Sequence, residues 1–345
     1  MRIFERLDEL YAIGGGQGAN RRSGSAGEQR AHDLVSGWLE EAGFEVERDS
    51  AANLIGRLRG TRPDLPELWA GSHLDSVPEG GRLDGPLGVL GGLEAVERIG
   101  PGERTLAVVA FRGEEVGCIG SRARVAEIGE LPGAFVELHI EQGPRLEHAG
   151  VPLGVVTAIV GYSRQTVTIT GRVGHAGTTP MDNRDDALCE AAERVLAIRN
   201  AARAIPEAVA TVGVLTVAPG GVNVIPGSVS FTVDVRAPDR GRLDRLLAAI
   251  GLETGVGVEP TVMDATVVDA VKAAIASLDV TPLELPSGAG HDAGILAAAG
   301  VPSAMLFVRS LNGGVSHSPA EHSSDEDILL AVDALERTLR DLGSV

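Results

Sequence analysis

Short apolar runs that end in polar clusters recur along the chain. They are residues 67–71 (ELWAG), 105–111 (TLAVVAF), 134–138 (AFVEL) and 303–308 (SAMLFV). Continuous short apolar runs are typical of strands that are buried on both faces of an α/β sheet. Ligands bind such sheets at the C-terminal ends of the strands. We therefore expect the chemistry of this protein in the polar residues that follow these runs.

Helical periodicity alternates with the predicted strands. Within residues 27–44, apolar side chains recur at helical spacing at Leu34, Val35, Trp38, Leu39 and Ala42. Residues 323–343 predict a closing helix, with Ser324 and Asp327 at the spacing of a capping box. The alternation predicts an α/β protein with a mixed sheet.

The middle of the chain follows a different pattern. Residues 164–173, 211–220 and 228–238 alternate between apolar and polar positions, as half-exposed antiparallel strands do. Helical stretches at 185–202 and 239–251 accompany them. We therefore predict a smaller α+β domain at 157–265, inserted into a larger domain made of 1–156 and 266–345.

Composition and charge narrow the possible functions. The 345 residues are 43% hydrophobic, without an apolar stretch long enough for a membrane span or a signal peptide, so we expect a cytoplasmic protein. A net charge of −18 argues against nucleic acid as a partner. Any anionic substrate needs local cations, and arginine must supply them because Lys272 is the single lysine. Cys118 and Cys189 form no paired motif and indicate neither a disulfide framework nor a thiolate metal site.

The first polar cluster, GSHLDSVPEGGRLDG at 71–85, contains His73, Asp75 and Asp84. A histidine and an aspartate two residues apart in extended chain point to the same side. A metal-bound imidazole commonly donates its other N–H to a carboxylate. Asp75 could therefore orient His73, and the glycine-rich loop could bring Asp84 to the same metal. The alternative is a hydrated surface loop.

Three further clusters follow the other predicted strands. They contain the adjacent pair Glu114 and Glu115, His139 in HIEQGP, and His317 in GGVSHSP. Adjacent side chains point apart, so one glutamate can be a ligand and the other an acid/base group; each cluster alone could instead be a solvated strand end or a core histidine. Together they make a nitrogen and oxygen donor set that suits Zn²⁺, Mn²⁺, Co²⁺ or Ni²⁺. Three histidines, one aspartate and one glutamate make five ligands. Five are too many for one tetrahedral ion, but they suit two ions that share a carboxylate.

These motifs carry a resemblance to a known family. GSHLDSVPEGGRLDG, EE, HIEQGP, GHAGTTPMDNRDDAL, VNVIPGSVSFTVDVR, SGAGHDA and SHSPAE occur in the order found in M20-type metallohydrolases of the N-carbamoyl-L-amino-acid hydrolase, allantoate amidohydrolase and β-ureidopropionase group. The chain resembles this group over nearly its whole length. The resemblance implies a binuclear metal amidohydrolase that cleaves a carbamoyl or ureido C–N bond of a small carboxylate-bearing substrate. Zn²⁺ is the first expectation, with Mn²⁺, Co²⁺ or Ni²⁺ as alternatives.

The resemblance also implies roles for the clustered residues. One metal would bind His73, Asp84 and His139, and the second would bind Asp84, Glu115 and His317. Glu114 would be the general base. Related exopeptidases more often have an acidic residue at the position of His139, which favours the ureido and amide branch.

Substrate contacts are implied in the same way. Gln142, Asn223 and Arg236 match substrate-binding positions, and the turn with Gly314 and Ser316 would offer N–H groups to a carboxylate. His175 matches a histidine that completes the neighbouring site in family dimers, so we expect a homodimer whose smaller domain pairs and closes over substrate. Without the motif order, Asn223, Arg236 and His291 would be a turn residue, an exposed charge and a helix-start residue. No motif includes His32, His148 or His322, and we expect them on the surface.

One segment departs from the family pattern. Only 23 residues separate Glu115 from His139, where family members carry a longer stretch. The size of the pocket is therefore open, and Cys118 is expected to be a buried filler near it. Two other functions remain: a dipeptidase or N-acyl-amino-acid hydrolase on the same scaffold, and a non-catalytic binding relative.

Overall fold

A computed structural model describes residues 2–127 and 131–344. By their internal contacts they form two compact units. The larger unit is Met1–Ile159 with Val262–Val345, and the smaller unit is the intervening segment Val160–Thr261. Each unit is described by itself.

The larger unit is built on a mixed sheet, as the sequence predicted. Among the described residues the sheet has nine strands in the order β1-β2-β4-β3-β5-β14-β6-β12, with β13 paired to β6. The pairs β3–β4, β3–β5, β5–β14 and β6–β13 are parallel, whereas β1–β2, β2–β4 and β6–β14 are antiparallel. The strands are β1 (Glu45–Arg48), β2 (Leu54–Leu58), β3 (Leu68–His73), β4 (Leu106–Phe111), β5 (Ala134–Ile140), β6 (Leu153–Ile159), β12 (Thr261–Val262), β13 (Leu283–Ser287) and β14 (Ser303–Val308).

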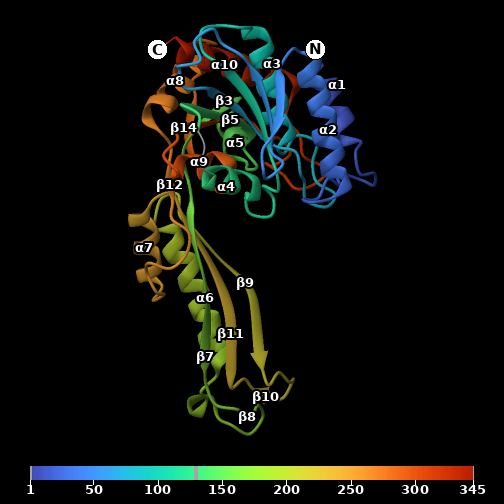
Figure 1. The fold of residues 1–345 in the computed structure, drawn as a ribbon. Coiled ribbons are helices and arrows are strands. Elements are labelled where there is room, and N and C mark those ends of the chain that lie inside the picture. The colour runs from blue at the N-terminus through green and yellow to red at the C-terminus, as the bar shows by residue number, and fades with distance from the viewer. Residues whose placement is uncertain (1, 128–130, 345) are drawn as a thin grey trace. The chain divides into compact units, whose positions relative to one another are not determined.

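Helices cover this sheet (Figure 1). Gly91 of α3 lies against the Leu138 side chain, whereas the Ala293 N–H of α9 binds Glu137. Successive strand residues point to opposite faces, so α3 and α9 lie on opposite sides of β5. The helices are α1 (Arg2–Tyr11), α2 (Ala26–Glu41), α3 (Pro86–Ile99), α4 (Ile119–Ala126), α5 (Arg145–Ala149), α8 (Ala265–Ala276), α9 (Asp292–Ala298) and α10 (Asp325–Gly343).

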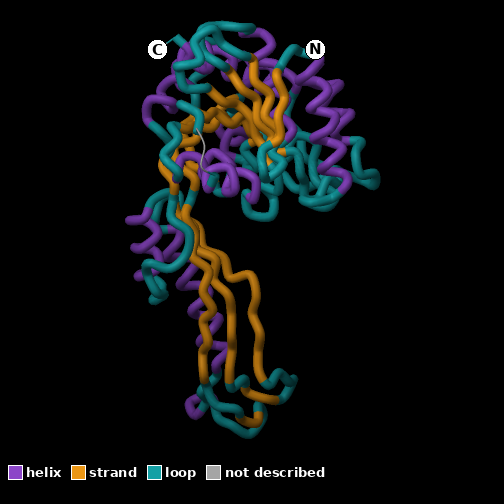
Figure 2. The backbone as a smooth tube through the Cα atoms, viewed as in Figure 1, coloured by secondary structure: helices purple, strands orange, loops and turns teal. Residues whose placement is uncertain are grey.

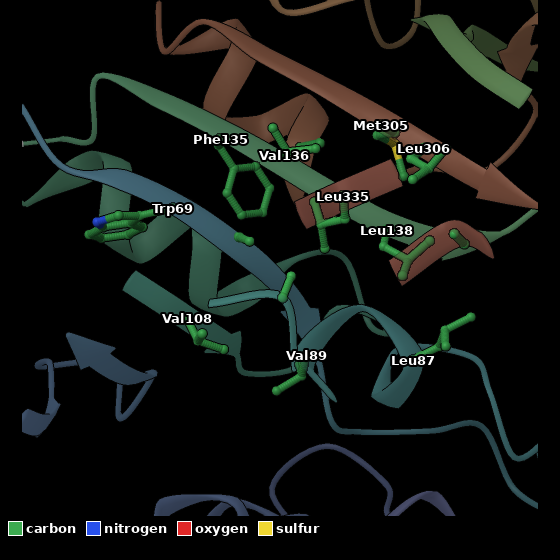
Figure 3. Close-up of a cluster of buried hydrophobic side chains, with 14 of the residues drawn as sticks. Trp69, Leu87, Val89, Val108, Phe135, Val136, Leu138, Met305, Leu306 and Leu335 are labelled. Atoms are coloured by element: carbon green, nitrogen blue, oxygen red, sulfur yellow. The ribbon is translucent and has the colours of Figure 1, made fainter. Parts of the chain in front are cut away.

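The core of the larger unit lies between the sheet and its helices. Figure 3 shows part of this core, in which Trp69 of β3, Phe135 of β5, Leu87 of α3 and Leu335 of α10 are buried. The Ser324 side chain accepts from the Asp327 N–H at the start of α10, as the capping-box spacing predicted. Close packing of this kind holds the strand ends in fixed positions.

The smaller unit is a three-stranded antiparallel sheet with one covered face (Figure 2). Alternate β11 residues, Val229 to Ala237, are buried in a core shared with helices α6 and α7. Asp186 and Asp239 cap these helices through their side chains. The elements are β7 (Gly161–Thr170), β8 (Gly174–His175), a 3₁₀ turn (Met181–Asn183), α6 (Ala187–Arg203), β9 (Val209–Ala218), β10 (Val224–Ile225), β11 (Ser228–Ala237) and α7 (Arg240–Ala249).

No helix within residues 2–127 and 131–344 has the length and apolar character needed to cross a membrane. The short segment between Glu115 and His139, which left the size of the pocket open, includes residues 128–130. These three lie outside the described residues.

Candidate active site

Four strand ends and the loops that follow them position the candidate metal ligands. His73 ends β3 and His139 lies near the end of β5, while the glutamate pair and His317 lie in the loops after β4 and β14. These four strands run parallel, so their carboxyl ends meet at one edge of the sheet. Asp84 reaches this edge just before α3, where Gly85 has φ 82° and a Cβ would lie 2.5 Å from the His73 ring. Only glycine fits there.

The first group of candidate ligands is His73, Asp84 and His139, all buried. Asp84 Oδ1 lies 3.7 Å from His73 Nε2 and 3.2 Å from His139 Nε2. His139 Nε2 is buried and has no hydrogen-bond partner among the described residues. The nitrogen and the oxygen thus converge without hydrogen-bond geometry, which is what two ligands of one cation do.

The second group is Asp84, Glu115 and His317. His317 Nε2 lies 3.3 Å from Asp84 Oδ2 and 3.4 Å from Glu115 Oε2. Asp84 therefore offers one carboxylate oxygen to each group. The oxygen and imidazole donors and the orphaned His139 nitrogen fit a pair of divalent cations that share Asp84.

The carboxylates and imidazoles of the two ligand groups shift one another's pKa values. Burial favours the neutral form of Asp84, but the nearby imidazoles of His139, His317 and His73 outweigh it and hold the pKa of Asp84 well below its usual range. The hydrogen bond to Asp84 raises the pKa of His317 to about 9. Cations would displace these protons, because imidazole ligands bind in the neutral form.

Glu114 and Glu115 have different surroundings. Glu114 Oε2 lies 3.8 Å from His73 Nε2, and Glu114 Oε1 lies 3.8 Å from His291 Nδ1. Burial raises the pKa of Glu114 well above its usual range, and the nearby carboxylates act in the same direction. A carboxyl group in this position can take up and release a proton during a reaction.

Asp75 supports both sides of the site. Its Oδ1 lies 3.3 Å from His73 Nδ1, a distance at which the carboxylate can orient that ring. The same carboxylate accepts hydrogen bonds from the backbone N–H groups of Glu114 (3.1 Å) and Glu115 (3.2 Å). One buried side chain therefore links the β3 end to the glutamate pair.

The predicted substrate contacts of the larger unit are already occupied within the chain. Gln142 Nε2 donates to Asp84 Oδ2 at 2.8 Å, and Ser316 Oγ lies 3.1 Å from the same oxygen. The N–H of Gly314 donates to the Leu311 carbonyl at 3.1 Å. Gln142 and Ser316 are thus partners of the candidate shared ligand, and the Gly314 amide would have to leave its carbonyl to bind a substrate.

The predicted contacts of the smaller unit lie at two ends of its sheet. His175 and Asn223 are neighbours: β8 pairs with β10, and the Ala176 N–H donates to the Asn223 carbonyl. Arg236 lies near the other end of β11, where its Nε donates to Asp234 Oδ1 at 2.9 Å. Ser228 and Arg236 are eight residues apart in extended chain, which corresponds to about 26 Å.

The sequence did not predict several buried polar residues near the candidate site. Arg21 is fully buried and donates to the carbonyls of Leu74 (2.8 Å) and Leu10 (2.9 Å). Glu321, at the end of SHSPAE, accepts from the backbone of the Asp84 loop. His291 immediately precedes α9 as expected, but it is also buried, with its ring centroid 4.5 Å from that of His139. A further group of Glu137, His139 and His291 shares His139 with the first group.

The expected surface position of His32 is wrong. The residue is fully buried in α2, and neither ring nitrogen has a hydrogen-bond partner among the described residues. The helical pattern placed the apolar positions but could not show that this polar position also faces the core. His148 and His322 are exposed. Cys118 is buried as expected, and burial raises the pKa of its thiol.

The chain is similar over nearly its whole length to known proteins. An N-carbamoyl-L-amino acid amidohydrolase from Geobacillus stearothermophilus is 39% identical over 399 residues, which cover 98% of this chain and 97% of that protein. Allantoate deiminase 1 from Glycine max is 31% identical, with 94% of this chain and 86% of that protein covered. The crystal structure of an amidase of the hydantoinase/carbamoylase family from Burkholderia multivorans matches with a TM-score of 0.89 and 33% identity, over 98% of this chain and 96% of that chain.

These matches confirm the resemblance seen in the motifs. The model of peptidase family M20/M25/M40 matches residues 69–341, which include every candidate metal ligand. The chain belongs to the peptidase family M20/M25/M40.

Proposed function

We propose that this protein is a metal-dependent amidohydrolase that cleaves a carbamoyl or ureido C–N bond of a small substrate with a carboxylate, such as an N-carbamoyl amino acid. The observation that carries the proposal is the pair of ligand groups that share Asp84, with the Glu114 carboxylate beside them. The names of the relatives, an N-carbamoyl-L-amino acid amidohydrolase and an allantoate deiminase, support the substrate class. A cytoplasmic location remains a prediction.

His73, Asp84 and His139 would hold one divalent ion, and Asp84, Glu115 and His317 a second; Zn²⁺ is the first candidate. When bound, such ions lower the pKa of water and stabilise negative charge on the carbonyl oxygen. Glu114 takes a proton from the attacking water as the water oxygen bonds to the carbonyl carbon. Glu114 then gives that proton to the leaving nitrogen as the C–N bond breaks.

Arg236 is the proposed partner of the substrate carboxylate, because a guanidinium binds a carboxylate with two parallel hydrogen bonds. His175 and Asn223 lie beyond the Ser228 end of β11, and that end is about 26 Å from Arg236. A small substrate cannot contact both ends of one sheet. We therefore propose a homodimer in which the His175 end of one chain serves the site of its partner.

A substrate panel tests the proposed function. Purified protein supplied with Zn²⁺, Mn²⁺, Co²⁺ or Ni²⁺ should release ammonia from N-carbamoyl amino acids, and chelation should abolish the activity. Glu114→Gln supplies the background rate. Dipeptides and N-acyl amino acids, assayed by release of free amine, should react much more slowly.

Each other outcome has a distinct meaning. Faster hydrolysis of dipeptides or N-acyl amino acids would make the protein a peptidase or aminoacylase on the same scaffold. Turnover that persists in the metal-free protein would exclude the metal-dependent mechanism. Metal binding without turnover of any substrate would favour a binding protein.

A further inference from the structure

Glu321 links two loops that carry candidate metal ligands. It is 7% exposed, and its Oε1 accepts from the backbone N–H groups of Leu83 (2.7 Å) and Asp84 (3.1 Å). Its Oε2 lies 2.9 Å from Ser316 Oγ. Glu321 follows His317 by four residues and is 237 positions from Asp84. One side chain therefore connects the loop before α3 to the loop after β14.

The glycine at position 81 shows how closely this carboxylate approaches. A Cβ on Gly81 would lie 2.1 Å from the Glu321 carboxylate. Any other residue there would push Glu321 away from the Leu83 and Asp84 N–H groups. The GGRLDG sequence thus accommodates the glutamate as well as presenting Asp84.

The contacts of Glu321 determine how Asp84 points. The Asp84 carboxylate must face two ways, with Oδ1 toward His139 (3.2 Å) and Oδ2 toward His317 (3.3 Å). Glu321 holds the backbone of Asp84 directly. It also contacts Ser316, whose hydroxyl lies 3.1 Å from Asp84 Oδ2. Both ends of the residue are therefore restrained by groups that Glu321 touches.

We propose that Glu321 is a positioning residue for the metal pair: its carboxylate holds the Asp84 loop against the His317 loop so that Asp84 can serve both ions. The inference rests on the proposed metal site, but not on the identity of the substrate. Glu321 belongs to neither of the two ligand groups. Removal of such supporting groups typically lowers metal affinity about 10- to 100-fold.

Two variants separate position from charge. In Glu321→Gln the amide oxygen still accepts from Leu83 and Asp84, and Ser316 can donate to Asp84 while it accepts from the amide nitrogen. Glu321→Asp retains the charge but withdraws the carboxylate by one methylene. We expect Glu321→Gln to bind metal nearly as the unmodified chain does, and Glu321→Asp and Glu321→Ala to bind the more weakly held ion about 10- to 100-fold less tightly.

The measurement is titration of the metal-stripped protein with Zn²⁺ against a chromophoric chelator, so no substrate is needed. The matched control is Asp49→Ala. Asp49 also accepts from two backbone N–H groups, of Ala51 (3.0 Å) and Asn53 (2.9 Å), and from the Asn53 side chain (2.7 Å), but it contacts no candidate ligand. Its substitution should lower thermal stability without changing metal affinity.

Unchanged affinity in Glu321→Ala and Glu321→Asp would overturn the inference. So would an affinity in Glu321→Gln as low as in Glu321→Ala, because the charge and not the position would then matter. If Glu321→Ala does not fold, the comparison of Glu321→Gln with Glu321→Asp still decides. An unmodified chain that binds no metal would instead refute the proposed function.

Discussion

The adjacent residues Glu114 and Glu115 have different surroundings. Glu114 faces the rings of His73 and His291, whereas Glu115 lies 3.4 Å from His317 within the second ligand group. In the loop after β4 the two side chains thus point to different sides. The side that each carboxylate faces is the reason for proposing Glu114 as the proton carrier and Glu115 as a metal ligand.

Substitution of the two glutamates should separate these roles. Glu114→Gln should retain metal and reduce kcat by about 10²- to 10⁴-fold, because only proton transfer is lost. Glu115→Gln should lose the second ion, because an amide is a weaker ligand than a carboxylate. Metal analysis and steady-state kinetics of both proteins test this. The reverse result would exchange the two assignments.

His32 should make folding sensitive to acid. Burial, followed by repulsion from Arg112 and Arg48, lowers the pKa of His32 well below 6.5. The unfolded chain therefore binds a proton below about pH 6.5 that the folded chain does not, so stability falls as the pH falls. The free energy of unfolding should drop by up to about 1.4 kcal/mol per pH unit for this group.

Urea unfolding between pH 7 and pH 5 measures this dependence. His32→Leu should remove that part of the slope, and His148→Leu is the control because His148 is exposed. Equal slopes for His32→Leu and the unmodified chain would show that His32 is protonated in the folded protein.

At the scale of elements, strand β11 organises the smaller unit. Its alternate residues Val229, Phe231, Val233, Val235 and Ala237 are buried, so Asp234 and Arg236 lie on the opposite face. Asp234 also binds Arg164 on the paired strand β7, with Nε to Oδ2 at 2.7 Å. The strand thus presents Arg236 with one carboxylate already fixed beside it.

Arg236→Ala should reduce kcat/KM by about 10- to 150-fold, because a charge-assisted hydrogen bond contributes about 1.5–3 kcal/mol. The loss should appear mainly in KM. A ureido compound without a carboxylate should be hydrolysed equally well by the variant and the unmodified chain. Arg164→Ala is the control, since Arg164 shares Asp234 but is not a proposed substrate contact. Near-normal kinetics of Arg236→Ala would place the carboxylate elsewhere.

At the scale of the whole molecule, the two ends of the smaller unit cannot serve one small substrate. This separation is the structural reason for expecting a dimer with two-fold symmetry. In such a dimer each site combines Glu114 of one chain with His175 of the other. His175 would donate to the oxygen that becomes negative during hydrolysis.

Mixing of two inactive variants tests this arrangement. His175→Ala and Glu114→Gln chains, unfolded together and refolded in equal amounts, should recover about one quarter of the normal activity. Half of the dimers would be mixed, and each mixed dimer would contain one complete site. Mixed dimers that form, as shown by tags on the two chains, and stay inactive would show that His175 does not act in the neighbouring site.

The sequence by itself determined the fold class, the family and the candidate ligands. Apolar runs followed by His73, Glu115 and His139 are local patterns. Ligands bind parallel sheets at the carboxyl ends of the strands, so these patterns predict where the side chains lie. Long motifs in a fixed order then identified the family. These features depend on residues close together in the chain, and they are visible without coordinates.

Only the tertiary structure decided which residues support the site and which polar groups are buried. Glu321 meets Asp84 across 237 positions, and Arg21 reaches Leu74 across 53. His32 occupies a helical position that looked exposed. The separation of Arg236 from His175 follows from the length of β11 and from the pairing of β8 with β10 beyond its Ser228 end. Such contacts are set by the packing of distant elements, because burial and long-range hydrogen bonds are properties of the assembled core and leave no local periodicity.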